Sequence, residues 1–100
     1  MANSLLKLQE TDRGITMTFE GNFTAVNAEI IKEALLQSAA RNGDEILSLL
    51  DATSVDASGI QLAFSWKKIL QRRGRKADVL LPQLENIKEL LIKTGITTIL

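Results

Sequence analysis

The spacing of apolar residues changes partway along this chain, and that change restricts the fold more than any other feature. In an early segment Ile15, Met17 and Phe19 share one face, while threonines and a glutamate occupy the other. A similar alternating segment precedes Asp12-Arg13-Gly14, so the period of two predicts a β-hairpin. After Gly21 the apolar residues follow a spacing of 3.6, which predicts helices separated by short apolar strands.

The predicted elements after the hairpin alternate between helix and strand. They are helices over 25–41 and 59–73, strands over 45–50 and 77–81, and a last helix that carries Leu84, Ile87, Leu91 and Thr94 and ends at Gly95. Residues 96–100 form either an edge strand or a segment lying on the core, with Ile96 against Leu91. The predicted fold class is α/β in one domain over 1–100: a mixed four- to five-stranded sheet opened by a β-hairpin, with about three to four helices packed on it.

Composition excludes several kinds of function. The 100 residues include no cysteine and no histidine, so disulfides, thiolate chemistry and the commonest general base and zinc ligand are absent. Twelve basic residues balance twelve acidic ones, and a basic run over 72–76 is interpreted as a solvated helix end. No apolar run is long enough for a membrane span, and residues 1–4 do not resemble a signal peptide. We therefore expect a cytoplasmic protein that is not an enzyme and has no cofactor, metal, nucleic acid or inserted membrane segment.

The segment from Leu50 to Leu62 is the most informative. Ser58 and Gln61 have the spacing of a capping box, in which the serine hydroxyl would accept a hydrogen bond from the first helical turn. The same geometry would also expose the hydroxyl to a kinase, and a phosphoryl group there would add about −1.5 to −2 charges. A structural cap and a phosphorylation switch both fit these residues.

Several short motifs of this chain, in this order, resemble those of STAS domains, the anti-sigma-factor antagonists and their relatives. The motif Asp56-Ala57-Ser58-Gly59-Ile60 is similar to the family signature, and Gly21-Asn22-Phe23-Thr24 to its early turn. The segment 89–96 is similar to the family's usual glycine-containing finish. The resemblance covers nearly the whole chain and implies a STAS-like fold.

The resemblance also implies a function for Ser58. Unmodified, such a bacterial domain binds a serine kinase that is also an anti-sigma factor and thereby regulates transcription; the kinase phosphorylates the serine and a phosphatase reverses this. A weakly associated second copy is a further predicted partner. Asp56 would position the hydroxyl or its loop. The implied partner-binding surface comprises Gly21, Asn22, Thr24, Asp51, Thr53, Ser54, Asp56, Gly59, Ile60, Gln61 and Leu62.

Two other functions remain open at this stage. Gln61-Leu62-Ala63 looks closer to STAS subunits of chemotaxis arrays or lipid-transport ATPases, in which Ser58 would mainly cap a helix. A small enzyme is the remaining alternative. On the second predicted helix, Trp66 is expected in the core, as are Leu62, Ile69 and Leu70, whereas Phe64 would be an interface residue if exposed.

Overall fold

The computed structural model describes residues 6–12 and 14–95. In chain order the elements are β1 (Leu6–Thr11), β2 (Gly14–Phe19), β3 (Gly21–Phe23), the 3₁₀ helix η1 (Ala25–Asn27), α1 (Ala28–Ala40), β4 (Glu45–Ser48), β5 (Ala52–Val55), α2 (Ala57–Arg72), β6 (Ala77–Leu80) and α3 (Ile87–Lys93). The boundaries of the predicted helices and strands therefore differ from the observed ones by a few residues at most. The predicted segment 96–100 lies outside the described residues.

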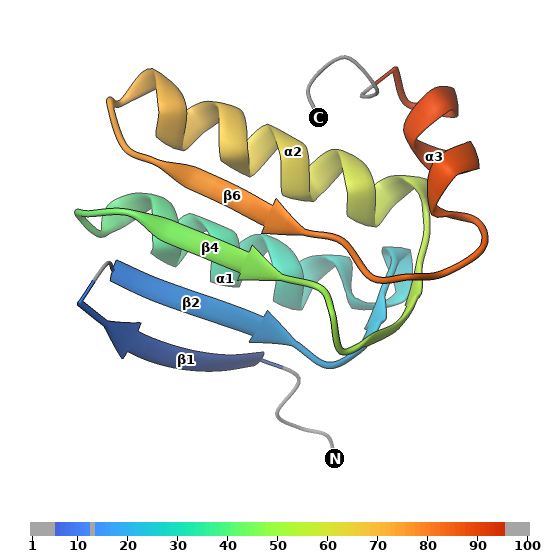
Figure 1. Ribbon diagram of the computed structural model, residues 1–100, viewed down its shortest axis with the longest axis horizontal. Coiled ribbons are helices and arrows are strands. Elements are labelled where there is room, and N and C mark those ends of the chain that lie inside the picture. Colours follow the sequence, from blue (N-terminus) through green and yellow to red (C-terminus); the bar gives the residue numbers. More distant parts are fainter. Residues whose placement is uncertain (1–5, 13, 96–100) are drawn as a thin grey trace.

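Within this part of the chain, four strands form the main sheet in the order β1-β2-β4-β6. The predicted hairpin is confirmed, because β1 pairs antiparallel with β2 and places Leu8 opposite Met17. Strands β4 and β6, which a helix connects, pair in parallel, as such a crossover requires. Helices α1 and α2 lie together behind the sheet and run in the same direction, while α3 lies beyond one end of it (Figure 1). The predicted mixed α/β architecture is therefore observed.

The hydrophobic core lies between the main sheet and the helices α1 and α2. Its largest fully buried apolar side chains are Met17, Phe19, Phe23, Ile31, Leu47, Leu49, Ile60 and Leu70. Trp66 is only 2% exposed, as expected, whereas Ile69 is 40% exposed and lies at the edge of the core. Phe64 is buried at 3% exposure, so the condition under which it would be an interface residue is not met. Alternation along each buried strand and the helical spacing together produce this single packed layer.

A second, smaller sheet was not predicted. Strands β3 and β5 pair in parallel beside the main sheet, with Phe23 opposite Val55. The sequence pattern predicts no strand over the residues of β5. Gly21 adopts a φ of +99°, and the strand register shifts after it, so the chain can leave β2 and turn directly into β3. This small sheet leads into both helices, β3 into α1 and β5 into α2.

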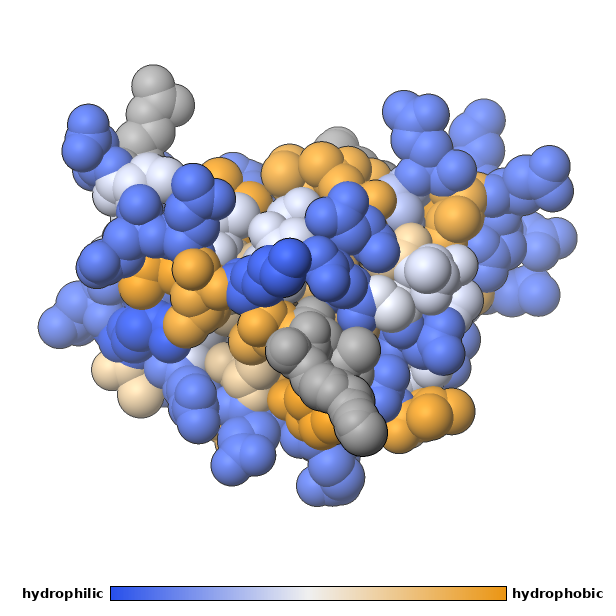
Figure 2. Space-filling model, turned by 90° about the horizontal axis from the view of Figure 1, so that it is seen from below, coloured by the Kyte–Doolittle hydropathy of each residue, from blue (hydrophilic) through white to orange (hydrophobic). Residues whose placement is uncertain are grey.

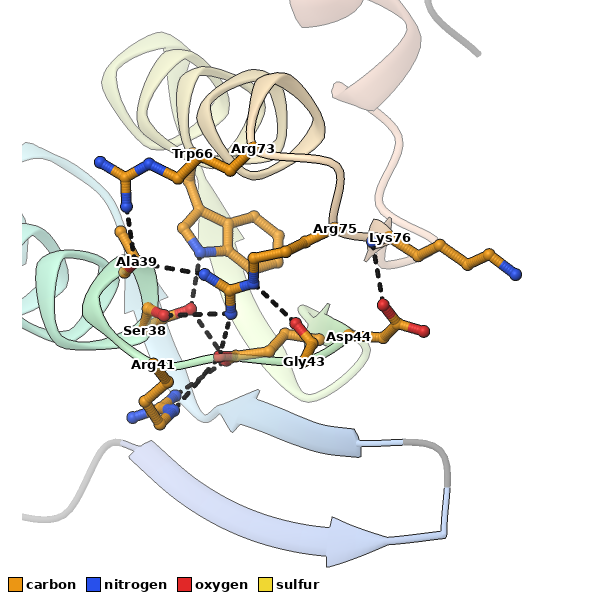
Figure 3. A network of polar contacts seen from close by, with 10 residues as sticks. Ser38, Ala39, Arg41, Gly43, Asp44, Trp66, Arg73, Arg75 and Lys76 are labelled. Atoms are coloured by element: carbon orange, nitrogen blue, oxygen red, sulfur yellow. Dashed lines mark hydrogen bonds and ion pairs between the residues drawn. The ribbon is translucent and has the colours of Figure 1, made fainter.

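A buried polar network lies at the end of the helical layer that is farther from the small sheet (Figure 3). The Glu45 side chain is 1% exposed and forms ion pairs of 2.8 Å with both Arg41 and Arg75. Ser38 donates a 2.8 Å hydrogen bond to this carboxylate and accepts one of 2.8 Å from the indole of Trp66. The interpretation of residues 72–76 as a solvated helix end is therefore wrong for Arg75, which supports the fold from within.

Outside the core, the surface near β1 is mixed in character. Seen from below, hydrophilic side chains surround several separate apolar patches (Figure 2). Leu8, on β1, is 56% exposed. None of the described helices is both long and apolar enough to cross a membrane. Nothing in the described part of β1 suggests a functional site. The candidate site lies instead in the polar turns next to the small sheet of β3 and β5.

Candidate functional site

Ser58 is exposed in the first turn of α2, immediately after the small sheet. The helix begins at Ala57, and its N-cap is Asp56, whose side chain accepts a hydrogen bond from the backbone N–H of Gly59. The predicted capping box between Ser58 and Gln61 is therefore wrong. The Ser58 hydroxyl makes no hydrogen bond to any residue in the described ranges, and it projects from a helix already capped by its neighbour.

The carboxylate of Asp56 joins two turns that are far apart in sequence. One oxygen accepts from Gly59 N at 2.9 Å, and the other accepts from Ala25 N at 3.1 Å. The start of α2 is thereby held against the start of η1. A carboxylate is also favourable at the positive end of the helix dipole. The sequence-based expectation that Asp56 positions this loop agrees with both contacts.

Asn22 organises the neighbouring turn. Its side-chain oxygen accepts hydrogen bonds from the hydroxyls of Thr53, at 3.1 Å, and Ser54, at 2.7 Å. Its backbone carbonyl accepts one of 2.7 Å from the side-chain amide of Asn27. The sequence analysis did not single out Asn27, because an asparagine near a helix start carries no signal of a partner five residues earlier. Asn22 and Asp56 together fix the polar surface next to Ser58.

Gly59 allows the helix to approach the small sheet closely. A Cβ atom at this position would overlap the carbonyl oxygen of Phe23 and lie 2.8 Å from its ring carbon Cδ2. Gly59 and Ile60 are both buried, Ile60 completely. This corrects their place in the predicted partner-binding surface: Gly59 and the side chain of Ile60 lie beneath that surface and not on it.

The other predicted surface residues remain accessible. Asn22, Asp51, Thr53 and Gln61 are exposed, and Gly21, Thr24, Ser54, Asp56 and Leu62 are partly so. Asp51 stands at a turn in which Ala52 N donates to Leu49 O at 3.1 Å. Two apolar side chains that the sequence analysis did not assign to the site lie on the same turns, Val26 at 84% exposure and Leu50 at 57%. The sequence pattern assigned Val26 to the helix over 25–41 and Leu50 to the strand over 45–50, so neither was assigned to the site.

The site combines the exposed hydroxyl of Ser58 with a carboxylate that already has hydrogen-bond partners. The carboxylate nearest to Ser58 in sequence, that of Asp56, is already engaged by two backbone N–H groups and is not poised as a general base. Within residues 6–12 and 14–95, no three side chains of metal-ligating type gather. An exposed hydroxyl at the positive end of a helix can accept a phosphoryl group from an external kinase, since such helix ends tolerate phosphate.

The fold and this site define a small α/β domain with the STAS fold. Among solved structures, the chain is similar to the anti-sigma-factor antagonist SpoIIAA in its unphosphorylated form, with a TM-score of 0.70 and 14% identity over 93% of this chain and 83% of that one. It is also similar to SpoIIAA, a Bacillus cell fate determinant, in the phosphorylated form, with a TM-score of 0.65 and 14% identity over 93% and 86% of the two chains. The predicted STAS fold is thereby confirmed.

A further similar structure is that of Mglu, with a TM-score of 0.61 and 23% identity. The match covers 82% of this chain but only 22% of that chain, so it concerns one part of a larger protein. No protein-family model matches the chain, and no curated protein does either. At identities of 14% and 23%, these similarities concern the fold alone. SpoIIAA, one of the similar proteins, is a regulatory protein.

Proposed function

We propose that this protein is a phosphorylation-controlled binding switch of the anti-sigma-factor antagonist type. Unmodified, it binds a serine kinase that is also an anti-sigma factor. Phosphorylation of Ser58 ends that binding, and a phosphatase restores it. The proposal places the protein in the bacterial cytoplasm, in a pathway that regulates transcription.

The exposure of Ser58, whose hydroxyl makes no hydrogen bond in the described part of the chain, carries this proposal. Asp56 already caps the helix, so Ser58 is not needed there. This distinction favours a switch over the alternative of an array or ATPase subunit in which Ser58 mainly caps the helix. The similarity to SpoIIAA, whose structure is known in both unphosphorylated and phosphorylated forms, supports the same assignment.

The physical basis of the switch is a change of charge on a surface that keeps its shape. A phosphoryl group adds about −1.5 to −2 charges at neutral pH. The first-turn N–H groups of a helix have no carbonyl partner within the helix, so α2 accommodates that charge. A partner packed over Ser58 with apolar or acidic groups does not, because it would bury the phosphate against unfavourable contacts.

The test begins with protein isolated from its host. Its mass, with peptide mapping, is expected to show one phosphoryl group on Ser58 under some growth conditions. Tagged Ser58→Ala should then retain the partner kinase that the unmodified wild type binds, whereas Ser58→Asp should lose it. Gln83→Asp, an exposed charge change in the segment before α3, is the control and should bind as the wild type does. Equal kinase binding by Ser58→Asp and the wild type would disprove the switch.

A further inference from the structure

A groove lies between the outer surfaces of α1 and α2. It has a volume of about 220 Å³, and its walls are almost entirely apolar. Leu36 of α1 and Ile69 of α2 stand on its two sides at 71% and 40% exposure, and the buried Trp66 forms part of its floor. Apolar side chains on neighbouring helices that stay this exposed are typical of an interaction surface.

The groove continues the line of residues that starts at Ser58. Along α2, Ser58, Leu62, Ser65 and Ile69 recur at spacings of four, three and four, which places them on one stripe of the helix. Leu62, Ser65 and Ile69 line the groove. Helix α1 runs beside α2 in the same direction (Figure 1). Ser58 lies about one turn before Leu62, the first groove residue of α2, on the same stripe of that helix.

The two rims of the groove differ in charge. Helix α2 contains no acidic residue, and Lys68 and Arg72 are exposed on it. Just beyond its end, the exposed Arg73 donates a 2.7 Å hydrogen bond to the carbonyl of Ala39, which lines the groove. The α1 rim instead carries the exposed Glu29 and Glu33, with Lys32 beside the groove. The α2 rim is thus uniformly cationic and the α1 rim is mixed.

We propose that this groove binds an amphipathic helix of a partner protein, with the apolar side of that helix in the groove and carboxylates along the flank that faces α2. A third helix packs naturally on the surface between two neighbouring helices, and it presents apolar residues at spacings of three and four. The cationic rim selects carboxylates on one flank only, since the opposite rim is not cationic. The occupant is therefore an acidic helix with a defined orientation.

The groove also accounts for the sign of the switch at Ser58, a step that rests on the proposed function. A phosphoryl group on Ser58 would place negative charge at one end of the stripe that receives an acidic helix. Repulsion between like charges would then weaken binding along the whole groove. The charge difference alone produces release, and no change in the fold is needed.

The experiment uses the single tryptophan of the chain, Trp66, as its reporter, because it lies in the groove floor. The probe is a synthetic amphipathic peptide of about 18 residues with leucines along one side and glutamates on one flank. The comparison peptide has glutamine at each glutamate position. Titration of the full chain should change Trp66 fluorescence saturably, and the acidic peptide should bind about tenfold more tightly at low salt, with the difference shrinking as salt rises. Equal affinities, or no binding, overturn the proposal.

Variants separate groove binding from loss of folding. Leu36→Glu and Ile69→Glu should each weaken binding of the acidic peptide by about tenfold or more, with unchanged far-ultraviolet circular dichroism. Ile92→Glu, a matched change at a 67% exposed position on α3, should leave binding as it is. A concentration-dependent dimer that Leu36→Glu dissolves would show that a second copy occupies the groove, and this would overturn the proposed occupant.

Ser58→Asp distinguishes the groove from the switch. It should weaken the acidic peptide several-fold and leave the glutamine peptide unaffected. If the groove variants lose the peptide while Ser58→Asp keeps full affinity, the groove is supported and its electrostatic link to Ser58 is overturned. If the host's kinase depends on Ser58 but the peptide never binds, the proposed function is supported and the groove is rejected.

Discussion

At the scale of single residues, Gly59 is the position that allows the candidate site to form. Its backbone lies so close to Phe23 that a side chain has no space, and this contact joins the first turn of α2 to β3. Unlike the other five glycines of the chain, which adopt positive φ angles, Gly59 is buried and does not. Its role is therefore close approach, and the consequence for a larger residue can be predicted.

Gly59→Ala should destabilise the protein by about 1–3 kcal/mol, the usual cost of forcing atoms into a packed region. The sign is informative, because alanine is the better helix former by about 1 kcal/mol and would stabilise an exposed helical position. Urea unfolding followed by Trp66 fluorescence gives the measurement. Ser65→Ala, at an exposed position of the same helix, is the control and should be neutral or slightly stabilising. A stabilised Gly59→Ala variant would contradict the close approach.

Asp56 makes two contacts that one pair of substitutions can separate. Asp56→Asn keeps one side-chain oxygen, which can accept from Gly59 N. It replaces the other oxygen, the acceptor of Ala25 N, with an NH2 group that can only donate. Asp56→Ala removes both. We expect Asp56→Ala to lose about 1–2 kcal/mol, as for other lost caps, and Asp56→Asn to lose less. Chemical denaturation measures both values. Equal losses in the two variants would show that the Ala25 contact, and not the cap, supplies the stability.

The same residue shows where sequence reasoning stopped. Asp56 and Ser58 are both good capping residues, two positions apart, and local sequence does not choose between them. The choice is made by Ala25, 31 residues earlier, whose N–H group binds the second oxygen of Asp56. The motif around Ser58 was therefore found from sequence, whereas the residue that caps the helix depends on a tertiary contact.

At the scale of elements, the long apolar periods were predictable and the short strands were not. Helices α1 and α2 and the main-sheet strands follow their expected periods, because each buries one face or stripe. Strand β3 has only three residues, and β5 has two polar residues, Thr53 and Ser54, at its centre, so neither shows the short apolar run expected of a buried strand. They exist because they pair with each other and because Asn22 binds the Thr53 and Ser54 hydroxyls.

The ion pairs of Glu45 are another feature of the elements, since they join the end of α1 to the starts of β4 and β6. Arg75 also donates to the backbone carbonyls of Ser38, Ala39 and Gly43. From the sequence, a basic run near a helix end is expected to be solvated. The carboxylate that pairs with Arg75 belongs to Glu45, which lies 30 residues away and gives no local signal. Because the Glu45 carboxylate is buried, the stability of the protein is sensitive to the loss of either member of the Glu45–Arg75 ion pair.

Arg75→Ala should destabilise the protein by about 3 kcal/mol, because it leaves Glu45 buried with only part of its compensation. Arg72→Ala, an exposed arginine in the same basic run, should change stability by no more than about 0.5 kcal/mol. Guanidinium or urea unfolding provides both values. The double variant with Glu45→Leu and Arg75→Met removes both charges. It should therefore lose less stability than the sum of the losses measured for Glu45→Leu alone and Arg75→Met alone. Strict additivity would argue against a coupled pair.

At the scale of the whole molecule, the two ends of the helical layer have different roles. The Glu45 network holds the ends of α1 and α2 that lie farthest from Ser58 (Figures 1 and 3). The other end carries the polar turns and the exposed Ser58. The contacts that hold the two helices together at the Glu45 end lie far from Ser58. A charge added at Ser58 should therefore change partner binding and leave folding unaffected.

This separation predicts how stability responds to charge along α2. Ser58→Asp places a carboxylate at the positive end of the helix dipole and should leave stability unchanged or raise it by up to about 1 kcal/mol. Gln71→Asp, an equal charge change in the exposed last turn of the same helix, should lower stability by a comparable amount. Thermal and urea unfolding at low salt measure the two shifts, and added salt should reduce both, because exposed charges are screened. A Ser58→Asp variant that is less stable than Gln71→Asp would mean that negative charge at this serine disrupts the framework, in which case partner release would be a consequence of local unfolding.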